Sequence, residues 1–85
     1  MAIFNSLRNA AVNAFEMRTV RKEVQRMREI LGIFDEGLGA YFNSFALTEL
    51  QKLENAKRLP PDQFEFAAKV VRQEIYERYA RYRPC

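Results

Sequence analysis

The sequence predicts an all-α protein: a small three- or four-helix bundle or a helical hairpin, with a long N-terminal helix that is either straight or bent. Apolar residues recur every three or four positions, acidic residues precede basic ones at i,i+4, and two short breaks divide the chain. At 85 residues, the chain forms one small domain, residues 1–85. A domain of this size buries only roughly 60–65% of its unfolded surface, so a protein partner or a second copy would help to stabilise it.

The clearest helical pattern covers residues 61–83. Pro61 suits a first helical turn, and Asp62 places a negative charge near the helix N-terminus. Pro84 should end the helix. The apolar positions that form one stripe are Phe64, Ala68, Val71, Ile75, Tyr79 and Tyr82.

A second helix is predicted over residues 44–58, with Ser44 as its N-cap. The segment before it, residues 32–39, contains three glycines and is predicted to be a turn. An earlier start at Asp35 would also fit the apolar spacing. Gly37 and Gly39 argue against it, because each weakens a helix by about 1 kcal/mol relative to Ala.

The first 31 residues contain two apolar stripes. At ~100° per residue, the second stripe lies nearly opposite the first on a straight helix. Either the helix over residues 3–31 bends or breaks near residues 16–19, or its two halves bury their stripes against different neighbouring surfaces. The first stripe is Ile3, Phe4, Leu7, Ala11, Ala14 and Phe15; the second is Met17, Val20, Val24, Met27 and Leu31.

The predicted core draws on all the helices and on the second of the two N-terminal stripes. It leaves the first stripe unassigned. Its members are Val20, Val24, Met27, Leu31, Phe42, Phe45, Leu50, Leu53, Phe64, Ala68, Val71, Ile75 and Tyr79.

The unassigned stripe motivates the leading functional hypothesis, a non-enzymatic protein–protein interaction module. Such a protein would be an adaptor, a regulator or a small subunit of a larger assembly. Residues 1–16 would then act as an amphipathic docking segment that is separate from the core. The predicted partner-binding residues are Phe4, Leu7, Ala11 and Phe15. The partner is a different protein or a second copy, as in a homo-oligomer.

A basic stretch gives the alternative hypotheses. Arg18, Lys22 and Arg26 are spaced at i, i+4 and i+8, so they form a cationic ladder opposite the second stripe. The ladder is either a solvated face, paired in part with acids such as Glu49 and Glu54, or a site for an anionic partner. RNA or DNA is one such partner, and an acidic protein patch is another. A third is an anionic membrane surface, with which the N-terminal amphipathic segment would associate. The residues predicted for nucleic-acid or anion binding are Arg18, Arg21, Lys22, Arg26, Arg28, Tyr76 and Arg83.

Several kinds of chemistry are excluded by composition. The chain has no His and one Cys, Cys85, so imidazole catalysis, Cys–His nucleophiles and the usual zinc sites are ruled out. No phosphate-binding loop is present. We therefore expect no enzyme activity, no cofactor, no metal and no small-molecule substrate. No signal-peptide pattern and no membrane-spanning apolar run are found, so we expect a cytoplasmic protein.

Overall fold

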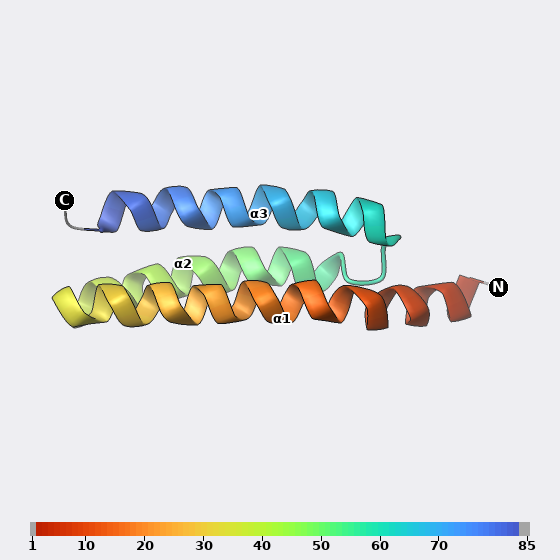
Figure 1. Ribbon diagram of the computed structural model, residues 1–85, viewed down its shortest axis with the longest axis horizontal. Helices are drawn as coiled ribbons and strands as arrows, with labels where there is room; N and C mark the ends of the chain where they lie inside the picture. Colours follow the sequence, from red (N-terminus) through yellow and green to blue (C-terminus); the bar gives the residue numbers. More distant parts are fainter. Residues whose placement is uncertain (1, 84–85) are drawn as a thin grey trace.

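The computed structural model describes the backbone of residues 2–83 and the side chains of residues 5–83. Within residues 2–83 it contains three helices and no strand: α1 (Ala2–Phe34), α2 (Glu36–Asn55) and α3 (Pro61–Tyr82). Each helix runs antiparallel to the one before it, so α1 and α3 point the same way (Figure 1). All three pairs of helices pack together. The predicted all-α class is confirmed, as a three-helix bundle.

The N-terminal helix is one unbroken α-helix from Ala2 to Phe34. The bundle measures 50 × 16 × 16 Å, and a helix of 33 residues is about 50 Å long, so α1 spans the molecule. A break near residues 16–19 is not found. The two apolar stripes therefore lie on different sides of the same helix.

Two predictions for this region are wrong: the Gly-rich turn over residues 32–39 and the helix N-cap at Ser44. α2 begins at Glu36, and Asp35 alone separates it from α1. The carboxylate of Asp35 caps α2 by accepting a hydrogen bond from the backbone N–H of Leu38 at 3.1 Å. Ser44 lies inside α2 and donates its hydroxyl hydrogen to the carbonyl of Ala40.

The glycines serve close helix packing instead of a turn. Gly39 is buried in α2 where that helix meets α1. A Cβ atom at Gly39 would lie 3.1 Å from the carbonyl oxygen of Arg28 and from the backbone of Gly32. Because these are backbone atoms, the two helices could not keep this separation with a larger residue. The cost of glycine in a helix is offset by the close approach.

A short connection over residues 56–60 separates α2 from α3. α2 ends at Asn55, three residues before the predicted end, and Pro61 occupies the first turn of α3. Asn13 of α1 is only 3% exposed, and its amide donates hydrogen bonds to the carbonyls of Lys57 (2.9 Å) and Leu59 (3.0 Å). These bonds fix the α2–α3 loop against α1.

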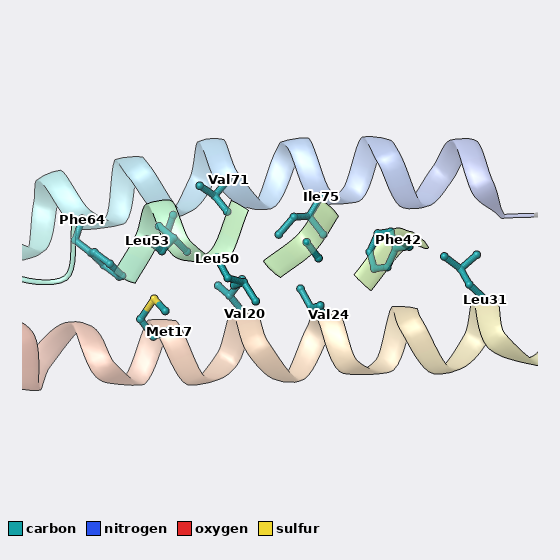
Figure 2. Close-up of a cluster of buried hydrophobic side chains, with 12 residues drawn as sticks. Met17, Val20, Val24, Leu31, Phe42, Leu50, Leu53, Phe64, Val71 and Ile75 are labelled. Atoms are coloured by element: carbon teal, nitrogen blue, oxygen red, sulfur yellow. The ribbon is translucent and has the colours of Figure 1, made fainter. Parts of the chain in front are cut away.

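The core runs along the axis between the three helices (Figure 2). Met27, Phe45 and Tyr79 of the predicted core are partly buried, and its other members are fully buried. Met17 and Ala46 are buried as well, although they were not in the predicted core. The buried apolar side chains are Met17, Val20, Val24, Leu31, Phe42, Ala46, Leu50, Leu53, Phe64, Ala68, Val71 and Ile75.

Candidate docking surface on α1

The first apolar stripe lies in solvent. We call Leu7, Ala11 and Phe15 the outer strip of α1. Leu7 is 52% exposed, Phe15 is 73% exposed, and Ala11 is also exposed. Val12 extends this apolar surface toward α3. The side chain of Phe4, the fourth residue predicted for this site, lies outside the described residues.

Helix geometry accounts for this exposure. α2 and α3 cover the side of α1 that carries Met17, Val20 and Val24. Phe15 and Val20 are five residues apart, which turns the side chain by about 140° away from the core. The first turns of α1 also project beyond the α2–α3 loop (Figure 1). Nothing in the bundle is therefore positioned to cover the outer strip.

A shallow hollow adjoins the outer strip. It has a volume of about 200 Å³ and lies between α1 and the beginning of α3. Val12 and Phe15 form its α1 side, and Pro61 and Phe64 form its α3 side. An apolar side chain from a partner could enter beside Phe15.

The cationic ladder lies along the same outer side of α1. We call Arg18, Lys22 and Arg26 the basic row. All three are exposed, and none forms a salt bridge with another side chain of residues 5–83. The guanidinium of Arg18 lies 6.0 Å from the centre of the Phe15 ring, so the row begins where the outer strip ends.

The acids of α1 face away from the basic row. Glu16 and Glu23 both bind Arg72 of α3, Glu16 at 2.8 Å. They are the only carboxylates between residues 5 and 28, so this part of the outer face is left without negative charge. The sequence held a signal for this arrangement, since neither acid has a Lys or Arg four residues later.

Tyr76 belongs to the same α1–α3 cluster. Its hydroxyl donates a hydrogen bond to Glu23. Burial raises the pKa of Glu23, but the hydrogen bonds from Arg72 and Tyr76 and the charge of Arg72 outweigh burial and hold that pKa below its usual value. Burial and the hydrogen bond to Glu23 raise the pKa of Tyr76. Tyr76 therefore does not form one anion-binding site with the basic row, because its hydroxyl donates a hydrogen bond across the α1–α3 contact.

The remaining cations of the predicted anion site are dispersed. Arg21 pairs with Glu54 of α2 at 3.2 Å, whereas no residue of the ladder pairs with Glu49 or Glu54. Glu49, the other expected acid, is buried and lies 2.9 Å from Lys52 of its own helix. Arg28 borders a separate hollow at the α1–α2 corner.

Arg83 lies at the end of the bundle where α3 finishes and α2 begins. Its guanidinium is 6.0 Å from the ring of Tyr79. The rings of Tyr41 and Tyr82 meet at the same end, 5.9 Å apart. The predicted set of seven residues is therefore not one surface. Within residues 5–83, Arg28 and Arg83 form no salt bridge either, but they lie apart from the basic row.

Other large apolar residues are also exposed, among them Tyr41, Leu47 and Leu59. Ile33 (80% exposed) and Phe34 lie at the α1–α2 corner, and Phe66 (70% exposed) and Val70 lie on the outer side of α3. The sequence interpretation placed Ile33 and Phe34 in a turn and assigned no role to Phe66 or Val70. They provide comparison sites for the experiments below.

Within the described residues, no group of three or more His, Cys, Asp or Glu side chains could hold a metal ion. No helix in this part of the chain is long and apolar enough to cross a membrane. No family model, no curated protein and no solved structure matches the chain.

Proposed function

We propose that the protein is a non-enzymatic protein–protein interaction module, an adaptor, regulator or small subunit of a larger assembly, that binds its partner through the outer strip of α1. The observation that carries this proposal is the exposure of Leu7, Ala11 and Phe15 along one side of α1. Contiguous exposed apolar surface of this kind is typical of interaction sites. We place the protein in the cytoplasm, because a chain with one cysteine forms no internal disulfide and so suits a reducing compartment.

The energetics favour a small and specific contact. Full burial of a Leu or Phe side chain is worth about 1.5–3 kcal/mol, and the exposed parts of Leu7 and Phe15 are available for a partner. Aromatic residues often dominate the binding energy of protein interfaces. The hollow beside Phe15 gives the partner a site for one side chain of its own.

Affinity capture with the intact protein tests the proposal. Phe15→Asp should abolish capture of a stoichiometric protein partner without unfolding the bundle, because Phe15 is mostly exposed. Phe66→Asp is the matched control, with a Phe of similar exposure on α3. A nuclease-treated sample shows whether the contact is direct. Equal capture by the wild type and the Phe15→Asp variant, or loss only in the Phe66→Asp variant, would contradict the proposal.

Nucleic-acid binding is a second candidate, because the basic row is unpaired and the α1 acids near it face α3. Three phosphate contacts predict a slope of roughly −2.7 when the logarithm of the duplex-DNA binding constant is plotted against that of the salt concentration. Fluorescence anisotropy with generic DNA and RNA across a salt series measures this slope. Lys22→Glu should weaken binding. Absence of binding at low salt, or binding without a salt slope, excludes this function.

Membrane association uses the same arrangement, since the outer strip and the basic row share one side of α1. An apolar helical segment followed by cations suits the surface of an anionic bilayer. Co-sedimentation should then occur with anionic vesicles and not with neutral ones, and Phe15→Asp should abolish it. Equal sedimentation with both kinds of vesicle, or with neither, excludes this function.

A further inference from the structure

We propose that the partner of the outer strip is an acidic amphipathic helix, whose apolar side chains cover the strip while its carboxylates pair with the basic row. This inference rests on the proposed function, since it names the chemistry of the partner that the same surface binds. Three features of α1 carry it: one continuous exposed side, a row of unpaired cations, and a hollow at the apolar end.

The outer strip and the basic row form one straight surface. Their successive members are four, four, three, four and four residues apart, which keeps all of them within about 100° of one side of α1. The surface runs for about 28 Å from Leu7 to Arg26, and every member is exposed. A second helix of about 19 residues has the same length. One partner helix lying along α1 can therefore contact both parts at once.

The basic row favours an anionic occupant. Its neighbouring cations are about 6 Å apart along the axis, less than the ~8 Å Debye length at physiological salt, so they repel one another. Within residues 5–83 none of the three forms a salt bridge, because Glu16 and Glu23 bind Arg72 instead. A carboxylate beside each cation replaces this repulsion by attraction, whereas a neutral partner leaves it in place.

Glu29 marks the far end of the basic row. It lies three residues beyond Arg26 on the same side of α1, and its carboxylate accepts a hydrogen bond from Gln25 at 3.0 Å. The acidic part of the partner is therefore confined to about 12 Å between Arg18 and Arg26, the span of three carboxylates spaced four residues apart on a helix. Duplex DNA carries phosphates along its whole length, so it would meet Glu29 at one end and the apolar strip at the other.

The apolar end has the relief of a protein contact. The small side chain of Ala11 lets a second helix approach to about 8–10 Å. The hollow of about 200 Å³ between Phe15 and Phe64 can receive one side chain, and Glu16 and Glu65 also border it, so that side chain is apolar and not acidic. This places the partner's carboxylates at the basic row. A lipid surface presents no fixed side chain to such a hollow, so the relief favours a protein over a membrane.

Fluorescence anisotropy with labelled synthetic helices tests the pairing. The probe is an Ala-rich peptide of about 20 residues that carries Leu and Glu side chains at the spacing of the α1 surface, made with Leu first and with Glu first. Control peptides carry Lys in place of Glu or Ser in place of Leu. We expect the Glu peptide, in one of its two orders, to bind the intact protein at least about tenfold more tightly than either control, and less tightly as salt rises. Equal binding of the Glu and Lys peptides, or no binding of the Glu peptide up to about 1 mM, would overturn the inference.

Charge reversal locates the contact on α1. Lys22→Glu should weaken binding of the Glu peptide about fivefold and strengthen binding of the Lys peptide, because the sign of one ion pair is reversed. Lys69→Glu is the matched control, since it makes the same change in net charge at an exposed position of α3. Equal effects of the two variants would overturn the inference, because binding would then depend on net charge alone.

The outcomes separate this inference from the proposed function. If the Glu peptide does not bind but Phe15→Asp still abolishes capture of a protein partner, the outer strip is an interaction site whose partner is not acidic. If neither result is obtained, both proposals fail. Tighter binding of generic duplex DNA or of anionic vesicles than of the Glu peptide, at the same salt concentration, assigns the basic row to that partner and overturns the inference.

Discussion

Gly39→Ala tests the corner where α1 and α2 meet. The added methyl group would approach the backbone of Arg28 and Gly32 to 3.1 Å, closer than nine in ten such contacts in real proteins. The helices would have to move apart, and overpacking of this kind costs about 1–3 kcal/mol. Ala also favours the helix by about 0.5–1 kcal/mol relative to Gly. The difference between these terms is a net loss of up to about 2.5 kcal/mol, set by how far the two helices must move apart.

Gly32→Ala is the matched control. A Cβ atom at Gly32 meets nothing within 4 Å, so this variant should gain about 0.5–1 kcal/mol from helix propensity alone. Urea denaturation followed by circular dichroism measures both variants. A change of 1 kcal/mol corresponds to a shift in Tm of about 4–8 °C for a domain of this size. If Gly39→Ala is as stable as Gly32→Ala, the close helix approach at this corner is refuted.

Three further predictions concern charged groups. Arg72→Ala should lower the free energy of unfolding by about 1–2 kcal/mol, because it leaves the Glu23 carboxylate without its cation. A double-mutant cycle with Glu23→Gln should show a coupling energy between Arg72 and Glu23. Because the pKa of Glu23 and that of Glu54 are held below the ordinary value of 4.5, their contribution to stability should be complete above that pH and lost as the pH falls through the lowered values. Urea titrations at neutral and acidic pH measure this loss, and it should be smaller in Arg72→Ala; an equal loss in both proteins would contradict the role of Arg72. Glu49→Leu should be neutral or stabilising, because it replaces a buried carboxylate by an apolar side chain while Lys52, which is mostly exposed, stays in solvent. Lys52→Ala should destabilise, because it leaves the buried carboxylate without its partner. Thermal melts of the two variants should therefore shift in different directions, and a large loss in Glu49→Leu would contradict this expectation.

The helical class and most of the core could be predicted because apolar spacing records which side of a helix is buried. Phe64, Ala68, Val71 and Ile75 follow one stripe, and all are buried. The exposure of Leu7 and Phe15 also follows from spacing, because no second apolar stripe of the chain remained to cover them.

The start of α2 at the α1–α2 corner could not be predicted, because helix propensity disfavours glycine there whereas the close packing of the two helices requires it. Gly37 and Gly39 weaken a helix locally, yet α2 includes both. The contact that favours Gly39 comes from Arg28 and Gly32, on another helix. Propensity alone contains no information about such a neighbour.

The role of Tyr76 was missed for a related reason. In the sequence, Tyr76 stands among arginines and resembles part of a basic and aromatic surface. Its position 53 residues from Glu23 becomes a contact only when α3 lies parallel to α1. Long-range polar pairs of this kind depend on helix order, which spacing within one helix does not determine.

The outer strip and the buried residues Met17, Val20 and Val24 lie on opposite sides of one continuous helix. The most direct test compares the free energies of unfolding of the Phe15→Asp and Met17→Asp variants. Phe15→Asp should change the free energy of unfolding by less than about 0.5 kcal/mol, as substitutions at exposed positions do. Met17→Asp places a charge at a position that is only 4% exposed, so it should lower the free energy of unfolding by more than about 3 kcal/mol. Similar losses in the two variants would contradict the claim, because Phe15 would then be buried in the same interior as Met17.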